Sequence, residues 1–258
     1  MTTTPIRLTL VVPAYNEEAR IAASLQQIGA YLAQLETPIE VIVVDDGSRE
    51  PGRRAAEASL KALPPGIERR FIAHPVNRGK GAAVRTGCLA ARGQYVAFID
   101  ADLASPPEDL AGLIAALDAG ADVAVGVRNQ DDGSDMRDDR RVARRVAGRL
   151  FAFVMKRLLL PNVGDSQCPL KAFSRGAAQR LFRLQRIDTW AFDAEILYLA
   201  TRLGLRVQEI PVRWQAMPGS HLKLNLKSAS ELWNLLSIRW THRNVSRSTL
   251  AGEVPEPA

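Results

Sequence analysis

The sequence has few cysteines and no long apolar run, and both shortages exclude classes of protein. Its 258 residues include two cysteines, Cys88 and Cys168, too few and too widely spaced for a disulfide framework or a cysteine metal site. No stretch reaches the roughly 18 apolar residues that cross a bilayer, and the longest candidate, 150–160, is interrupted by Lys156 and Arg157. The first residues lack the pattern of a secretion signal. We therefore expect a reduced, cytoplasmic protein with peripheral membrane contact at most.

The composition is otherwise that of one large globular domain. Hydrophobic residues make up 47% of the chain, which is enough to bury a core. The formal net charge of +6 favours an anionic partner, such as nucleic acid, a membrane surface or a phosphorylated substrate, without choosing among them.

The first half alternates short apolar runs with amphipathic stretches. The apolar runs predict strands at 8–12, 41–44, 70–73, 95–99 and 123–127, and the amphipathic stretches predict helices at 17–35, 52–62, 80–92 and 106–118. This alternation is typical of an α/β fold with a mainly parallel sheet and helices on both faces. Ligands of such sheets bind at the carboxyl ends of the strands.

Three of these strand ends carry unusual polar residues. The first strand runs into "PAYNEE" at 13–18, the second into "DDGS" at 45–48, and the fourth into "DAD" at 100–102. Parallel strands bring all three groups to one rim of the sheet. One acidic strand end is commonly a helix cap, but three on one rim predict a ligand site. In particular, Asp100 and Asp102 should repel each other unless a cation or ligand hydroxyls lie between them.

A glycine-rich loop, "NRGKGAAVRTG" at 77–87, comes before one of the predicted helices. It lacks the spacing of a Walker loop. Gly79 and Gly81 permit close backbone approach, and Lys80 adds a positive charge, which together suit a phosphate or a nucleotide edge. Gly-Lys-Gly is also an ordinary way to start a helix, so the loop is a weak signal by itself.

The second half contains two basic segments with a helical pattern, 140–160 and 226–240. The first has long apolar blocks between arginines, and the second carries Trp233 and Trp240. Basic amphipathic helices with tryptophan can lie on an anionic membrane surface. A core helix with a solvated arginine face explains the first segment equally well.

Four motifs in order, "VVPAYNEE", "VIVVDDGS", "NRGKGAAVRTG" and "FIDADLASPPEDL", resemble the family 2 glycosyltransferases of the GT-A fold. The later motifs "DSQCPLKAF", "FDAEILYLA" and "EIPVRW" narrow the resemblance to polyprenyl-phosphate sugar synthases. Leu103-Ala104-Ser105 is similar to the dolichyl-phosphate β-glucosyltransferases, because the mannosyl branch usually has glutamine at the position of Ala104. The chain departs from that branch at Pro169-Leu170, where Gly-Phe is usual, and at His221, where lysine is usual.

The resemblance implies a reaction and a domain plan. The reaction is inverting, metal-dependent transfer of a hexose, expected to be glucose from UDP-glucose, to polyprenyl or dolichyl phosphate at the cytoplasmic face of the membrane. Mannosyl transfer from GDP-mannose and transfer to a soluble or glycan acceptor are alternatives. The plan is one GT-A domain over 1–243, with a nucleotide-sugar half at 6–127, an acceptor- and membrane-facing half at 128–243, and a disordered tail at 244–258.

The resemblance also implies roles for the residues of the rim. Mg²⁺ or Mn²⁺ prefers oxygen ligands and would neutralise the charge that grows on the leaving diphosphate. Asp102 is expected to bind this metal, with Asp100 assisting it or binding the ribose. The full set expected to bind the nucleotide, with uracil as its base, is Pro13, Ala14, Tyr15, Glu17, Asp45, Lys80, Asp100, Ala101 and Asp102.

The acceptor determines what else the site needs. A lipid phosphate is already ionised and attacks without a general base, but cations must bring the two anions together. The candidate cations are Arg128, Arg140, Arg141, Arg144, His221 and Lys223, with Arg141 expected to act in catalysis. A sugar hydroxyl would instead require a carboxylate base, and Asp165 is the candidate; otherwise Asp165 orients Lys171 or the arginines.

Two readings without catalysis compete with the enzyme. A basic module that binds nucleic acid is disfavoured, because an acidic rim repels phosphates. A helper subunit with an inactive site is disfavoured by the intact Asp100-Ala101-Asp102 motif. We therefore expect no nucleic-acid partner.

Overall fold

The computed structural model describes residues 5–128, 168–215 and 226–245. Their strands form a 7-stranded sheet of order β3-β2-β1-β4-β6-β5-β7. The strands are β1 (Leu8–Ala14), β2 (Ile39–Asp45), β3 (Ile67–Ala73), β4 (Tyr95–Phe98), β5 (Val123–Val127), β6 (Lys171–Ser174) and β7 (Val207–Pro211). The helices are α1 (Ile21–Leu32), α2 (Glu50–Lys61), α3 (Lys80–Ala90), the short 3₁₀ turn η1 (Pro107–Asp109), α4 (Leu110–Asp118), α6 (Arg175–Leu184), α7 (Phe192–Leu203) and α8 (Leu226–Thr241).

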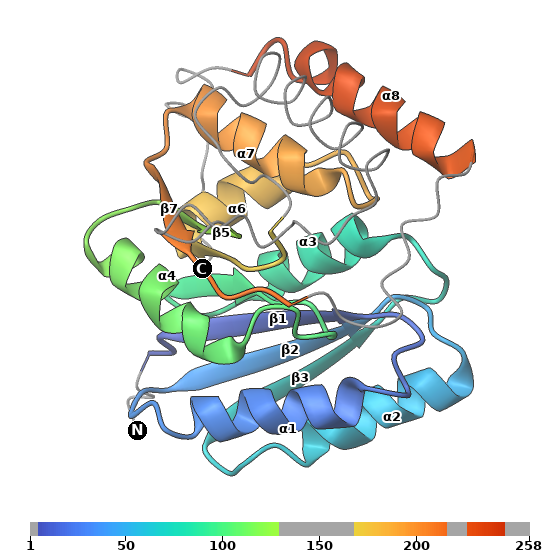
Figure 1. Cartoon of the computed structure of the whole chain (residues 1–258), viewed down its shortest axis with the longest axis vertical. Helices are drawn as coiled ribbons and strands as arrows, with labels where there is room; N and C mark the ends of the chain where they lie inside the picture. The colour runs from blue at the N-terminus through green and yellow to red at the C-terminus, as the bar shows by residue number, and fades with distance from the viewer. Residues whose placement is uncertain (1–4, 129–167, 216–225, 246–258) are drawn as a thin grey trace.

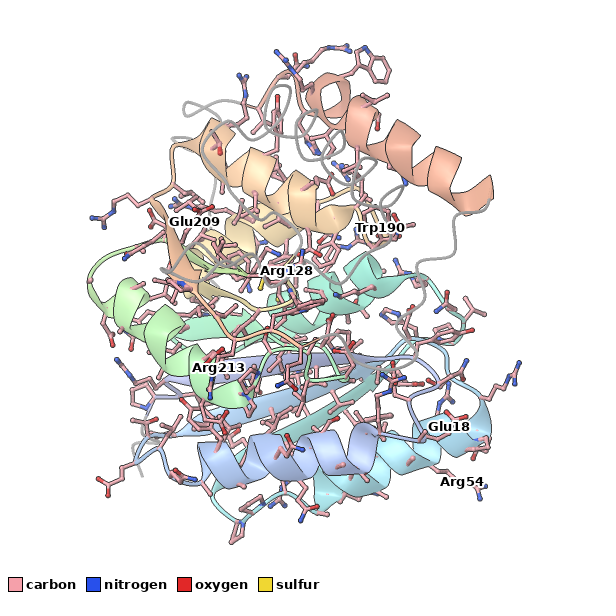
Figure 2. All side chains as sticks on the ribbon, viewed as in Figure 1. Glu18, Arg54, Arg128, Trp190, Glu209 and Arg213 are labelled. Carbon is pink, nitrogen blue, oxygen red and sulfur yellow. The ribbon has the colours of Figure 1, made fainter. Side chains whose placement is uncertain are left out.

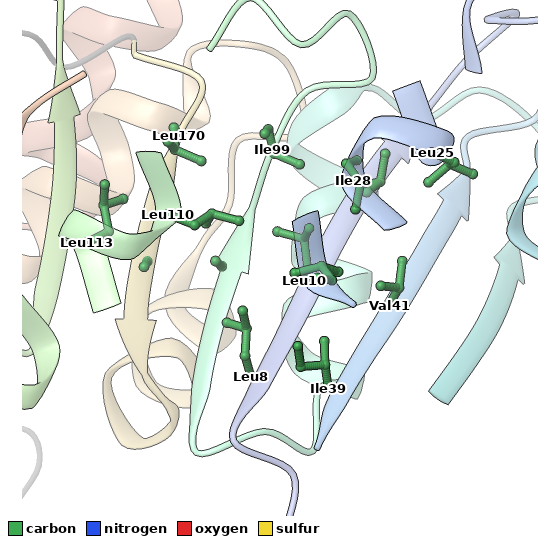
Figure 3. Close-up of a cluster of buried hydrophobic side chains, with 14 of the residues drawn as sticks. Leu8, Leu10, Leu25, Ile28, Ile39, Val41, Ile99, Leu110, Leu113 and Leu170 are labelled. Atoms are coloured by element: carbon green, nitrogen blue, oxygen red, sulfur yellow. The ribbon is translucent and has the colours of Figure 1, made fainter. Parts of the chain in front are cut away.

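Helices cover both faces of the sheet, as expected (Figure 1). Successive residues of a strand point to opposite faces, so Leu10 and Val11 of β1 belong to two different cores. The first core packs the sheet against α1, α2 and α4, and Figure 3 shows part of it, including Leu10, Leu25 and Leu113. The second core packs the other face against α3, α6, α7 and α8.

The pairing of the strands confirms the expected rim. β1 is parallel to both β2 and β4, and β2 is parallel to β3. In the register of β1 with β2, Ala14 lies opposite Asp45, so the two strands end together. The loops that follow β1, β2 and β4 therefore lie at one edge of the sheet.

One strand runs against the others and was not predicted. β6 is antiparallel to its neighbours β4 and β5 and lies between them, while β7 is parallel to β5. β6 has four residues and begins with a lysine, so its sequence carries no alternating apolar signal. The helix that follows it, α6, was not predicted either.

Several expectations concern residues outside the described ranges. They are the basic helix at 140–160 and most of the tail. Of that tail, Val245 is described, and its carbonyl accepts a hydrogen bond of 3.0 Å from Arg202 Nε of α7. The described helices include none with the length and apolar character needed to cross a membrane.

Candidate active site

The turn after β4 carries the two carboxylates expected to bind a cation. Ala104 N donates a hydrogen bond of 3.1 Å to Asp102 Oδ1, which closes the turn on itself. Ser24 Oγ of α1 donates to Ala101 O at 2.6 Å and fastens the turn to that helix. Asp100 and Asp102 are therefore held by the fold at the carboxyl end of β4.

Lys80, the first residue of α3, pairs with the first of these carboxylates. Its Nζ lies 2.7 Å from Asp100 Oδ1 and donates to Asp100 Oδ2 at 2.7 Å. Burial would lower the pKa of Lys80, but the negative charges of Asp100 and Asp193 outweigh it and hold this pKa above its usual value. The glycine-rich loop thus delivers its positive charge to the carboxylate pair.

The remaining carboxylates give the rim an excess of negative charge. Burial, reinforced by the charge of Asp100, raises the pKa of Asp102. Burial also raises the pKa of Glu17, to which Asp102 and Asp100 add, although Arg20 opposes the rise through an ion pair of 2.8 Å. Carboxylates whose charged forms are disfavoured in this way mark a place where a cation would be stabilised.

These residues fit a divalent metal that shares its shell with a ligand. Asp100 Oδ1 is buried and lies 2.7 Å from Lys80 Nζ, so a cation bound at this oxygen would share it with the lysine. Within those residues no group of three or more His, Cys, Asp or Glu forms a closed metal cage. One or two carboxylates, completed by phosphate oxygens and water, are the usual protein contribution to a Mg²⁺ site.

Asp46, for which the sequence indicated no role, anchors the glycine-rich loop. Its buried carboxylate accepts hydrogen bonds from Arg78 N at 3.0 Å and Gly79 N at 2.7 Å. It also accepts from Asn77 Nδ2 at 2.8 Å and from His74 Nδ1 at 2.7 Å. These four bonds fix the loop immediately before Lys80, so Asp46 positions the lysine that pairs with Asp100.

The residues expected to bind the base lie at the ends of β1 and β2. Pro13 and Ala14 close β1, and the next residue, Tyr15, has 48% of its surface exposed. The side chain of Asp45 has no exposed surface and pairs with Arg53 Nε at 3.2 Å. Asp45 was expected to bind the base, and this stays a prediction. In the structure its carboxylate is engaged by Arg53.

A buried ion pair lies close to the carboxylates and was not foreseen. Lys171 Nζ of β6 donates to Asp193 Oδ1 of α7 at 2.5 Å and to Cys168 O at 2.7 Å. Neither member of the pair is appreciably exposed. Burial raises the pKa of Asp193, while the positive charges of Lys171 and then Lys80 oppose the rise. The partner of Asp193 is 22 residues away in the sequence, so no local spacing indicated the pair.

Of the cations expected to bind the acceptor, the structure describes Arg128, the first residue after β5. Its guanidinium carbon lies 5.2 Å from the centre of the Trp214 ring. Figure 2 labels Arg128 near the centre of the molecule, together with Arg213. Trp214 was missed because the sequence shows only a tryptophan shortly after a strand.

The other candidates lie outside the described residues. These are Arg140, Arg141, Arg144, Asp165, His221 and Lys223. Their expected roles, including the catalytic roles of Arg141 and Asp165, remain predictions.

The C-terminal helix has an exposed apolar edge. Leu235 and Ile238 of α8 are buried, whereas 48% of Leu236 and 72% of Trp240 are exposed. The guanidinium carbon of Arg243 lies 5.1 Å from the centre of the Trp240 ring. The end of α8 therefore presents an aromatic ring together with a positive charge.

Several known proteins with similar sequences are named dolichyl-phosphate beta-glucosyltransferase. The model of the family "Glycosyl transferase family 2" matches residues 9–182. Proteins named dolichyl-phosphate beta-glucosyltransferase are similar over most of the chain. The one from Drosophila melanogaster is 38% identical and covers 84% of this chain and 69% of its own length. The one from Dictyostelium discoideum is 32% identical and covers 92% and 75%.

Solved structures agree at the level of the fold. Glucosyl-3-phosphoglycerate synthase from Mycobacterium tuberculosis, crystallised with UDP, superposes with a TM-score of 0.65 at 24% identity, covering 93% of this chain and 81% of that one. The same enzyme was crystallised with Mn²⁺, UDP-glucose and phosphoglyceric acid, with a TM-score of 0.63. Mannosyl-3-phosphoglycerate synthase from Rubrobacter xylanophilus gives 0.64 at 17% identity, covering 98% of this chain and 78% of that one.

Proposed function

This chain belongs to glycosyl transferase family 2 and has the GT-A fold, and from that membership we propose that it transfers glucose from UDP-glucose to a polyprenyl phosphate such as dolichyl phosphate. The observation that carries the proposal is the Asp100–Asp102 pair at the end of β4, in a chain that is 32–38% identical to dolichyl-phosphate beta-glucosyltransferases. The mannosyl alternative has less support, because the relatives named above are glucosyltransferases.

The leaving group sets the first requirement of this reaction. Negative charge grows on the UDP diphosphate as its bond to the anomeric carbon breaks. Mg²⁺ or Mn²⁺, when bound, neutralises part of that charge. Asp102 and Asp100 would hold the ion, and Lys80 keeps the carboxylate of Asp100 oriented through contacts of 2.7 Å to its oxygens. The loops after β1 and β2, from Pro13 to Glu17 and at Asp45, would hold the uracil and ribose.

The acceptor sets the second requirement. A phosphate oxygen of the lipid is ionised near neutral pH, so it attacks the anomeric carbon directly and inverts its configuration. Arg128 would screen the repulsion between this phosphate and the diphosphate, as would Arg140, Arg141, Arg144, His221 and Lys223. No proton has to leave the attacking oxygen, so Asp165 would have an orienting role.

We further propose that the enzyme works as a peripheral protein on the cytoplasmic face of the membrane. A polyprenyl chain stays in the bilayer, so the enzyme must reach the lipid phosphate at the surface. The exposed Leu236 and Trp240 of α8, with Arg239 and Arg243 beside them, have the mixed apolar and basic character of an interfacial helix.

The test is a transfer assay with purified protein, Mn²⁺ and labelled UDP-glucose or GDP-mannose. Each donor is incubated with and without a short-chain polyprenyl phosphate, and the Asp102→Asn variant is the control. We expect label from UDP-glucose in the lipid phase only when lipid phosphate is present, and none with the variant. Donor turnover without a lipid product would overturn the acceptor assignment and favour a soluble or glycan acceptor with Asp165 as base. Equal activity of Asp102→Asn would refute the metal assignment.

A further inference from the structure

The stack of Arg128 on Trp214 supports an inference that deepens the proposed function. We propose that Trp214 is a positioning residue that presents the guanidinium of Arg128 to a phosphate group beside the Asp100–Asp102 turn. The phosphate belongs either to the acceptor lipid or to the diphosphate of the donor, and both offer the same chemistry to an arginine. The inference rests on the proposed function for the identity of these ligands.

Hydrogen bonds made by the two sequence neighbours of Trp214 hold its backbone in place. Before it, Arg213 N donates to Asp109 Oδ2 at 2.7 Å, and Arg213 Nη2 donates to Asp109 Oδ1 at 2.7 Å. After it, Gln215 N donates to Ala104 O at 2.9 Å. The indole therefore sits on a backbone that is fixed one residue to either side.

The same segment joins Arg128 to the carboxylate turn. Val212 N donates to Val127 O at 3.0 Å, so the segment runs beside the strand end that carries Arg128. The hydrogen bond from Gln215 reaches Ala104 O, and the N–H of that residue bonds to Asp102 Oδ1. The segment 212–215 thus contacts both the end of β5, which carries Arg128, and the carboxylate turn. Trp214 lies within this segment.

The geometry of the stack suits the recognition of a phosphate. An arginine that lies over an aromatic ring uses the face of its guanidinium for the ring and keeps its N–H donors in the plane. These donors match the oxygens of a phosphate in a bidentate arrangement. A guanidinium already oriented by the ring also loses less conformational freedom when the phosphate binds.

The cost of removing the ring should be moderate and specific. Cation–π contacts of this kind correspond to about a 2- to 30-fold change in binding. Trp214→Leu should therefore raise the Michaelis constant of one phosphate-bearing ligand by about that factor. Trp214→Phe keeps an aromatic face and should recover most of the loss. A tryptophan that only fills space would show no preference for phenylalanine over leucine.

The experiment has two arms, which separate the two sources of phosphate. One arm measures the Kd of UDP with Mn²⁺ by calorimetry, and the other measures the Michaelis constant of a short-chain polyprenyl phosphate. If Trp214→Leu raises only the Michaelis constant of the polyprenyl phosphate, Arg128 binds the phosphate of the acceptor. If the variant binds UDP more weakly, Arg128 binds the diphosphate of the donor. Unchanged values in both arms, or a Trp214→Phe variant as impaired as Trp214→Leu, would overturn the proposal.

A double variant tests whether the tryptophan acts through the arginine. In an Arg128→Ala background, Trp214→Leu should add little further loss, because the group it positions is gone; a full additional loss would overturn the positioning role. If Trp214→Leu does not fold, Arg128→Lys replaces it, since lysine lacks the planar group that stacks. We expect Arg128→Lys to weaken the same arm, and normal values in both arms would count against the stack.

Arg206→Ala is the matched control. Arg206 precedes β7 and lies beside Asp122, at the opposite end of β5 from Arg128, and 72% of its side chain is exposed. It should leave both arms within about twofold of the wild type. The calorimetric arm needs no turnover, so it still tests the stack if the wild-type protein transfers no glucose to lipid, which would refute the proposed function alone.

Discussion

At the scale of single residues, a carboxylate inside the sheet and one in the turn after β4 differ in what surrounds them. Glu40, in β2, is fully buried and satisfied: it accepts hydrogen bonds from Thr9 Oγ1 at 2.8 Å and from Arg92 Nε at 2.8 Å. Hydrogen bonds and Arg92 outweigh the effect of burial and lower the pKa of Glu40. The pKa of Asp102 moves the other way, because burial and Asp100 oppose its charge. Glu40 therefore stabilises the fold, whereas the negative charge of Asp102 would be stabilised by a bound cation.

The two carboxylates of the turn should respond in opposite ways to neutralisation. Asp100→Asn leaves the ammonium of Lys80 half-buried without its partner, and we expect a loss of about 1–3 kcal/mol in the free energy of unfolding. Asp102→Asn removes a repelled charge, and we expect an unchanged or higher stability. Thermal unfolding of both variants in EDTA checks this, and a large destabilisation by Asp102→Asn would contradict it.

The buried pair of Lys171 and Asp193 should matter more for geometry than for stability. Lys171→Met leaves a buried carboxylate unpaired, and we expect it to cost about 3–5 kcal/mol in the free energy of unfolding. In Lys171→Met with Asp193→Leu neither charge of the pair remains, so stability should return to within about 1–2 kcal/mol of the wild type. Urea unfolding measures both variants. A double variant as unstable as the single one would show that the pair itself stabilises the fold.

The sequence alone located the carboxylates of the turn, but it did not indicate the contacts of Lys171, Asp193 and Trp214. The carboxylates of the turn were found because they follow a strand directly, and a strand end is visible in the apolar pattern. Lys171, Asp193 and Trp214 meet partners from distant parts of the chain. Only the fold brings such pairs together, so neither periodicity nor local spacing indicated them.

At the scale of elements, the start of α3 combines a special backbone with a close contact. Gly79 has a φ of 110°, and a Cβ there would lie 2.4 Å from the carbonyl oxygen of Asp188. The sequence identified this loop by its glycines, and the structure explains why position 79 requires a glycine. Any side chain would push this loop, which the Asp46 hydrogen bonds hold in place, away from the backbone of Asp188.

Gly79→Ala should therefore weaken both the fold and the nucleotide site. The positive φ and the contact with Asp188 O together should cost about 2–4 kcal/mol in the free energy of unfolding. UDP should also bind more weakly, because the displaced loop carries Lys80. Gly176→Ala in α6 is the control, since a Cβ there meets nothing within 4 Å; it should leave stability unchanged or improve it. Equal unfolding midpoints for the two variants would refute this account.

The elements predicted from the sequence were those with an apolar run or an amphipathic period. β1 and β2 are wholly buried, and β5 was predicted at the bounds it has, Val123–Val127. β6 was missed because a four-residue strand with a buried lysine resembles a loop. The mainly parallel sheet was right, but the sequence did not indicate its antiparallel member, β6.

At the scale of the whole molecule, α8 lies on the outside of α7 and presents part of its surface outward (Figure 1). Leu235 and Ile238 pack into the second core. Just beyond the helix, His242 Nε2 lies 2.6 Å from Glu195 Oε1 of α7, in a buried contact. The helix is therefore attached firmly along one side, and the exposure of Leu236 and Trp240 follows from how it is attached.

This exposed edge predicts how the protein meets a membrane. Replacing Leu236 and Trp240 together with serine removes the apolar surface without touching the buried side of α8, so the fold should persist. We expect binding to vesicles that contain anionic lipid to fall by about tenfold or more. Flotation measures it, and the wild-type binding should also weaken with added salt, because basic residues contribute.

Val76→Ser is the control: Val76 is 63% exposed but lies in the loop between β3 and α3. If the double variant floats as the wild type does, or the control loses as much binding, then α8 is not the membrane-binding element.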